Sequence, residues 1–220
     1  MRAFSPLQER PDMDATECLA GLRLMPVLAL SEETSALRLA HVLRDVGFRA
    51  LEITLRTPQA LSILQSLARA MPELTLGAGS LRSPVQIAEA KAAGAQFLVA
   101  PGHTETLLAT VHNERLPFVP GAATGSEMLR LLEAGYRLQK FFPAETLGGA
   151  PALRSFSAPL PEVRFFPTGG INSARLPSYL ALEAVATVGG SWFVSEAALQ
   201  AGDDDSLAAA AAEAWSLAHG

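Results

Sequence analysis

The feature that most constrains the fold of this chain is a set of short apolar runs that recur along its length. Eight such runs start about 21–26 residues apart. The strands that they predict are Leu24–Leu30, Ala50–Leu55, Leu74–Gly77, Gln96–Ala100, Pro117–Pro120, Leu138–Phe142, Val163–Phe166 and Ala184–Val188. Stretches rich in Ala, Leu, Glu and Arg lie between them and predict helices, for example Glu33–Val46. This alternation predicts βαβ units and a parallel sheet.

Eight strand–helix units in a chain of 220 residues is the number expected for a closed TIM (β/α)8 barrel. The sequence therefore predicts an α/β protein with a single barrel domain over residues 1–220. Within it, we expect residues 1–13 to be a loose N-terminal segment. We expect Asp14–Gly21 to form a short N-terminal helix that closes the floor of the barrel.

Three of the helix-to-strand junctions share one pattern, in which a glycine ends the helix and the strand follows without a gap. Glycine suits this position because it readily adopts the left-handed conformation that ends a helix. The three glycines are Gly47, Gly94 and Gly135. The fifth residue after each is Glu52, Val99 or Lys140, on strands two, four and six. Because alternate strands fill each interior layer of a barrel, Glu52 and Lys140 are predicted to face each other.

The second predicted strand carries three polar side chains on one face. Glu52, Thr54 and Arg56 alternate with apolar residues, and side chains alternate between the faces of a strand. In an antiparallel sheet this pattern is typical of a half-solvated strand. In a barrel the apolar face meets the helices, so the polar groups point inward and have to be paired or functional. Arg56, near the carboxyl end of the strand, is a candidate to bind a substrate carboxylate.

Lysine is rare in this chain, which makes each lysine informative. Of 17 basic residues, only Lys91 and Lys140 are lysines. Lys91 lies in an Ala-rich helical stretch, where a solvated face explains it. Lys140 lies within an apolar strand. Burial favours the neutral form of an amine, which can attack a carbonyl carbon to form a Schiff base. Lys140 is therefore either a nucleophile or a structural lysine in an ion pair with Glu52.

Glycine pairs follow the last two predicted strands, in Thr168-Gly169-Gly170 and in Gly189-Gly190-Ser191. Barrels often bind phosphate between these two loops through backbone N–H groups. The two pairs therefore predict a phosphate site, to which Ser191 adds a hydroxyl donor. Ser80 follows the third predicted strand and is a candidate either for substrate contact or for a helix cap.

Composition and missing motifs argue against several classes of function. The formal net charge of −5 is unlike that of proteins that bind nucleic acid or anionic membranes. We expect no membrane span, because no apolar run reaches about 18 residues, and no signal peptide. Cys18 is the single cysteine, which suits a reducing cytoplasm. The four histidines lack the spacing of a helical metal site, so we expect no metal.

Together these segments resemble the 2-keto-3-deoxy-6-phosphogluconate (KDPG) aldolase family, the class I pyruvate aldolases. The resemblance runs from about Asp14 to Gly202. It rests on the stretches Met25–Leu28, Leu51–Thr57, Gly77–Ser80, Ala95–Phe97, Pro101–Gly102, Lys140–Glu145, Pro167–Ile171 and Gly189–Trp192. The sequence departs from the family at His103, where an aliphatic residue is common, and slightly over residues 120–124.

The resemblance implies a role for each site residue. Lys140 would form the Schiff base, and Glu52 would be the general acid/base, acting through water. Arg56 would bind the pyruvoyl carboxylate, and Ser80 stands where the family usually has threonine. The implied substrate-binding set is Arg56, Ser80, Thr168, Gly169, Gly170, Gly190 and Ser191, of which Gly169, Gly170 and Ser191 would hold the 6-phosphate. The resemblance also implies a homotrimer without a dissociable cofactor.

The predicted activity is cleavage of KDPG to pyruvate and glyceraldehyde 3-phosphate, a step of the Entner–Doudoroff pathway. Related substrates remain open, namely 2-keto-3-deoxy-6-phosphogalactonate and 4-hydroxy-2-oxoglutarate. Other enzyme alternatives are a phosphosugar isomerase that uses Glu52 as a base and a metal-dependent pyruvate aldolase. A non-catalytic phosphate-binding barrel belongs to a different class. The presence of Glu52, Arg56 and Lys140 together favours the enzyme.

Overall fold

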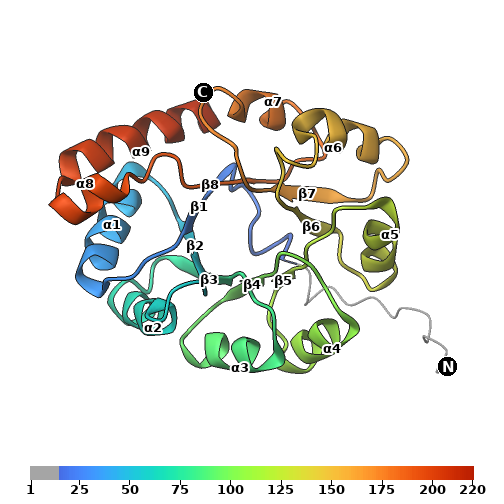
Figure 1. Cartoon of the computed structure of the whole chain (residues 1–220), viewed down its shortest axis with the longest axis horizontal. Coiled ribbons are helices and arrows are strands. Elements are labelled where there is room, and N and C mark those ends of the chain that lie inside the picture. The colour runs from blue at the N-terminus through green and yellow to red at the C-terminus, as the bar shows by residue number, and fades with distance from the viewer. Residues whose placement is uncertain (1–14) are drawn as a thin grey trace.

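Strands and helices alternate along the chain as the hydrophobic pattern predicts (Figure 1). The computed structural model describes residues 15–220. Its strands are β1 Leu24–Leu28, β2 Ala50–Thr54, β3 Thr75–Gly79, β4 Phe97–Val99, β5 Phe118–Val119, β6 Leu138–Phe141, β7 Arg164–Pro167 and β8 Val188–Gly190. Its helices are α1 Glu33–Val46, α2 Ala60–Ala70, α3 Pro84–Ala92, α4 Glu105–Glu114, α5 Gly125–Glu133, α6 Gly149–Ser157, α7 Leu176–Leu180, α8 Glu196–Ala201 and α9 Asp204–His219. None of these helices is long and apolar enough to cross a membrane.

The strands pair in parallel around a closed ring, which Figure 1 shows surrounded by the helices. Six strands follow the order β5-β4-β3-β2-β1-β8, and β6 pairs with β7. Isolated bridges join the two sheets on both sides. They are Gly121–Lys140, Phe165–Val185 and Thr168–Gly189. The predicted (β/α)8 barrel is therefore confirmed.

The eighth strand lies later in the chain than the sequence predicts. We expected Ala184–Val188 to be the strand and the following glycines to be a loop, whereas β8 spans Val188–Gly190. Gly189 and Gly190 pair with the first strand. A Cβ atom at Gly189 would lie 2.4 Å from Thr168 Oγ1. These glycines therefore belong to a strand with crowded surroundings. They are needed there because a side chain would not fit, and not because the chain turns.

The expected N-terminal helix is a series of turns over residues 15–21. The Leu19 N–H donates to the Ala15 carbonyl in a helical bond, but the Leu22 N–H donates to Leu19 with a spacing of only three residues. A segment this short forms too few bonds to offset the cost of starting a helix, and Gly21 ends it at a φ of +79°. The expected loose segment, residues 1–13, and Asp14 lie outside the described residues.

Two apolar layers hold the barrel together. The outer layer lies between strands and helices and includes the apolar face of β2, with Leu51 and Ile53. The second layer is smaller and includes interior residues of the barrel. It consists of Ala15, Leu19, Met25, Val27, Ala50, Phe97, Val99, Val119, Leu138 and Phe166. The turn over residues 15–21 thus closes the floor, as predicted, and the polar interior residues lie above an apolar plug.

Candidate active site

A cavity of about 500 Å³ opens at the carboxyl ends of the strands, where barrel enzymes place their active sites. Its lining residues come from the ends of several strands and from the loops that follow. They are Val27, Thr54, Arg56, Ser80, Arg82, Pro101, Lys140, Phe142, Thr168, Gly169, Gly170, Ile171, Gly189, Gly190 and Ser191. All the substrate-binding residues predicted from the sequence are in this set. Glu52 is not in this set, because it is fully buried, but it contacts the lining residue Lys140.

Lys140 and Glu52 form an ion pair inside the barrel. Lys140 Nζ lies 3.0 Å from Glu52 Oε1, and the two side chains are 6% and 0% exposed. The prediction that these residues face each other across the interior is therefore confirmed. The other carboxylate oxygen, Glu52 Oε2, has no hydrogen-bond partner within residues 15–220. It remains able to accept a proton or a hydrogen bond.

Gly79 makes the space that the buried carboxylate needs. It is the last residue of β3 and pairs with Thr54 on β2. A Cβ atom at Gly79 would lie 2.0 Å from Glu52 Oε1, closer than any real contact. The predicted third strand ends at Gly77, so the role of Gly79 in β3 was not predicted. The signal was present, since a glycine inside a strand often marks a close approach.

Aromatic rings and hydrogen bonds hold the cationic groups in place. Lys140 Nζ lies 5.5 Å from the ring centre of Phe166 and 5.8 Å from that of Phe142, close enough for a cation–π attraction. Thr54 Oγ1 donates to the Leu28 carbonyl at 3.0 Å and accepts from Arg56 Nε at 3.2 Å. Thr54 thus orients Arg56, which lines the cavity.

The cavity wall is positively charged. Arg56, Arg82 and Lys140 line it, and no Asp or Glu does. Neither arginine pairs with a carboxylate in the described part of the chain. The place of Arg82 in the cavity wall was not predicted. Its position two residues after Ser80 could have indicated it. A wall of this charge attracts an anionic substrate.

The loop after β7 has the backbone shape of an anion site. Gly169 and Gly170 both have positive φ, at +105° and +78°. Consecutive residues of this kind can turn their N–H groups toward one point and hold an anion. Thr168 Oγ1 is buried with no partner among the described residues. On the opposite side, Ser80 has a φ of +61°, a strained conformation of the kind that clusters at functional sites.

His103 lies outside the cavity lining. Its Nδ1 is 2.8 Å from the Gly121 carbonyl oxygen, so the imidazole joins the loop after β4 to the end of β5. Within residues 15–220, no three His, Cys, Asp or Glu side chains are grouped so that they could hold a metal ion.

Comparison with known proteins gives one consistent family. The sequence pattern of KDPG and KHG aldolases matches residues 15–210. The chain belongs to this aldolase family. The KHG/KDPG aldolase of Escherichia coli (strain K12) is 42% identical over 191 residues, which cover 87% of this chain and 90% of that protein.

Solved structures of the family share the fold. The KDPG aldolase of Legionella pneumophila, with pyruvate captured as a covalent carbinolamine, has a TM-score of 0.85 and 40% identity, covering 88% of this chain and 94% of its own. The enzyme of Zymomonas mobilis ZM4, with 3-phosphoglycerate, has a TM-score of 0.84 and 35% identity, covering 91% and 94%. The resemblance seen in the sequence is therefore confirmed, and the chain is an aldolase of this family.

Proposed function

We propose that the protein is a class I aldolase that cleaves KDPG to pyruvate and glyceraldehyde 3-phosphate. The observation that carries the proposal is the buried Lys140–Glu52 pair at the base of a positively charged cavity. A lysine in this setting is suited to Schiff-base chemistry. A relative over most of the chain is named KHG/KDPG aldolase, and the similar KDPG aldolase of Legionella pneumophila holds pyruvate as a covalent carbinolamine.

The reaction begins when Lys140 Nζ transfers a proton to Glu52, whose Oε1 lies 3.0 Å away. The neutral amine attacks C2 of the keto acid and forms a C–N bond. The resulting carbinolamine loses its hydroxyl group as water, with a proton returned by Glu52, and becomes a protonated imine. This imine is the electron sink that the next step requires.

Cleavage breaks the C3–C4 bond. Glu52, directly or through water, removes the proton of the C4 hydroxyl group. The bonding electrons move from C3–C4 into the imine, so glyceraldehyde 3-phosphate leaves and an enamine remains on Lys140. Protonation at C3 restores the imine, and water then hydrolyses it to release pyruvate and the free amine.

Anchoring at both ends of the substrate orients the reacting atoms. Arg56 binds the carboxylate with its paired N–H groups, and Ser80 adds a hydroxyl donor beside it. The phosphate binds to the backbone of Gly169 and Gly170, while the hydroxyl groups of Thr168 and Ser191 and the backbone of Gly190 complete this end. Holding reactants in a productive geometry can contribute on the order of 7–11 kcal/mol.

A second candidate substrate is 4-hydroxy-2-oxoglutarate. Arg82 supplies a guanidinium in the cavity in addition to Arg56, and a substrate with two carboxylates can use both. A relative named KHG/KDPG aldolase supports testing this compound. Assays of KDPG, its phosphogalactonate epimer and 4-hydroxy-2-oxoglutarate side by side would rank them by kcat/KM. A clear preference for 4-hydroxy-2-oxoglutarate would contradict the phosphate assignment.

The resemblance to the family also supports a homotrimer, and the single cysteine suits a reducing cytoplasm. Light scattering after size-exclusion chromatography tests the homotrimer. A mass of three chains is expected, and a monomer would contradict it.

Borohydride trapping tests the chemistry. The protein is incubated with pyruvate, and borohydride reduces any imine that forms. Mass spectrometry then gives the mass of the intact protein, and a digest locates the modified residue. Only Lys91, Lys140 and the N-terminal amine compete, and Lys91 is an internal control because it pairs with Glu114 on the surface. One pyruvate adduct on Lys140 is expected. No adduct on folded protein at several pH values would exclude the Schiff-base mechanism.

A further inference from the structure

We propose that Glu145, Arg175 and Tyr179 form a positioning group for the phosphate end of the substrate. They would orient the loop Thr168–Ile171 so that its N–H groups face the cavity, and leave the chemistry at Lys140 untouched. The inference rests on the proposed function, because it assumes that this loop binds the phosphate.

Three successive carbonyl oxygens of the loop are held from outside the cavity. The Ala144 N–H donates to the Thr168 carbonyl at 2.8 Å, and the Glu145 N–H donates to the next carbonyl, that of Gly169, at 3.1 Å. Arg175 Nη1 donates to the third, that of Gly170, at 3.2 Å. None of the three donor residues lines the cavity, whereas the loop does.

These contacts determine where the loop N–H groups point. In a trans peptide the C=O of one residue and the N–H of the next point in opposite directions. Holding the three carbonyls outside therefore turns the N–H groups of Gly169, Gly170 and Ile171 toward the cavity. These N–H groups donate no hydrogen bond within residues 15–220. Three such donors suit a phosphate group.

The Glu145 carboxylate holds the arginine in place. Its Oε1 accepts a hydrogen bond from the Tyr179 hydroxyl at 2.6 Å, and its Oε2 lies 2.9 Å from Arg175 Nε. Tyr179 is fully buried, and burial followed by the hydrogen bond to Glu145 raises its pKa. The hydroxyl therefore stays a donor. Arg175 also neutralises a carboxylate that would otherwise repel a nearby phosphate.

Packing couples Glu145 tightly to the loop. A Cβ atom at Gly170 would lie 2.8 Å from Glu145 Cβ. Because the backbone and side chain of Glu145 both contact the loop, a shift of this residue moves the phosphate donors. None of the three residues of the positioning group lines the cavity that Lys140 lines, so their loss is expected to change binding of the phosphate and leave imine formation intact.

The test compares Arg175→Ala with Arg154→Ala as a matched control. Arg154 is an exposed arginine in the last turn of α6 whose guanidinium makes no hydrogen bond or ion pair with residues 15–220. For each variant, kcat and KM for KDPG, inhibition by inorganic phosphate, and borohydride trapping with pyruvate are measured. Two milder variants are also measured. Arg175→Lys keeps the positive charge with a single donor nitrogen, and Tyr179→Phe removes the hydrogen bond to Glu145.

We expect Arg175→Ala to raise KM for KDPG and the inhibition constant of phosphate by about tenfold, with partial rescue in Arg175→Lys. Pyruvate trapping should stay at the wild-type rate, and Arg154→Ala should behave as wild type. Equal loss of trapping and KDPG turnover would show a merely structural role and overturn the inference, as would an unchanged KM. If the wild type itself neither cleaves KDPG nor binds phosphate, the proposed function fails instead.

Discussion

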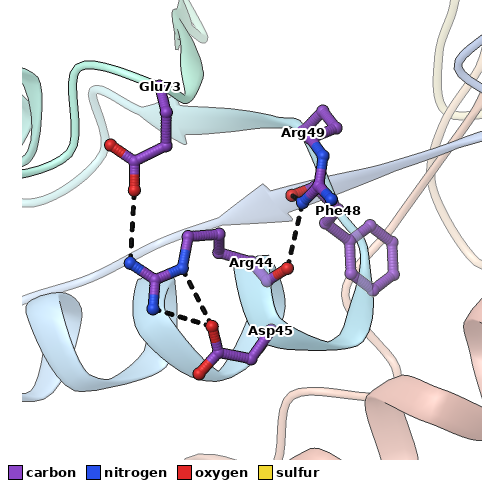
Figure 2. A network of polar contacts seen from close by, with 5 residues as sticks. All are labelled: Arg44, Asp45, Phe48, Arg49 and Glu73. Atoms are coloured by element: carbon purple, nitrogen blue, oxygen red, sulfur yellow. Dashed lines mark hydrogen bonds and ion pairs between the residues drawn. The ribbon is translucent and has the colours of Figure 1, made fainter.

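Two groups of opposite charges have similar N–O distances but lie in different surroundings. Inside the barrel, Lys140 Nζ lies 3.0 Å from Glu52 Oε1. Near the amino end of β2, Arg44 lies 2.7 Å from Asp45 and 3.2 Å from Glu73 (Figure 2). The first pair is almost completely buried, whereas the side chains of the second cluster are 31–67% exposed.

The difference teaches that exposure, more than distance, decides what an ion pair does. Water screens the outer cluster, so its charges contribute little to stability. The inner pair is almost completely buried, and removing one partner leaves a charge buried and unpaired. Because Lys140 Nζ lies 3.0 Å from Glu52 Oε1, a proton can pass between them directly. A buried pair under an open cavity is therefore a place for chemistry.

The largest effect is expected from breaking the inner pair. Lys140→Ala should lower kcat at least about 10⁴-fold, because the covalent step is lost. It should also destabilise the protein by about 3–5 kcal/mol, since Glu52 stays buried without its partner. Denaturant unfolding and turnover assays measure the two effects separately.

The double variant Lys140→Ala/Glu52→Gln sharpens this test. It should recover part of the lost stability and none of the activity, because the unpaired carboxylate is gone and the nucleophile is still absent. Normal turnover in Lys140→Ala would contradict the assignment of the nucleophile. Additive losses of stability in the double variant would contradict the coupling of the pair.

Crowding the inner pair should have the next largest effect. The methyl group in Gly79→Ala would overlap Glu52 Oε1, so we expect a loss of about 1–3 kcal/mol in unfolding free energy and at least tenfold in kcat. Gly125→Ala is the matched control, because a Cβ atom at Gly125 meets nothing within 4 Å. Similar behaviour of the two variants would show that Gly79 does not make space for Glu52.

Acid stability should depend on exposed carboxylates such as Glu32. Hydrogen bonds from Ser35 and Thr34 at the start of α1 lower the pKa of Glu32 from 4.5 to about 2. A lowered folded-state pKa stabilises the protein above pH 4.5, and that contribution is lost as the pH falls toward 2. Glu32→Gln should therefore flatten the decline of stability between pH 4.5 and 2. An unchanged slope in denaturant unfolding would contradict the lowered pKa.

The smallest effect is expected from breaking the outer cluster. Arg44→Ala removes both ion pairs but leaves the Arg44 carbonyl free to accept from Arg49. The melting temperature should change by no more than about 2 °C, and kcat and KM should stay at their wild-type values. A large shift in either quantity would show that exposure does not separate the two clusters. Calorimetry and the aldolase assay measure these quantities.

Much of the fold and the centre of the site follow from local patterns. Regular spacing of the apolar runs predicts the barrel because each βαβ unit buries one strand and one helix face. The shared position after three helix-ending glycines predicts that Glu52 and Lys140 meet, since barrel layers repeat with the strands. The glycine pairs likewise mark the loops that line the cavity.

Other features depend on segments that are distant in the chain. Gly189 has no room for a side chain because Thr168 approaches it, and Gly79 has none because Glu52 lies against it. The charge at Arg82 matters only because the loop after β3 ends at the cavity.

By itself the sequence determined the alternation of strands and helices, the polar inner face of β2 and the shared register of Lys140 and Glu52. The reason is that periodicity and register are properties of short segments. The tertiary structure decided the space around the carboxylate, the end of β8 and the contacts of Glu145 with Tyr179, 34 residues further along the chain. The physical reason is that side-chain packing and hydrogen-bond geometry arise between segments. They take definite values only once the barrel has closed.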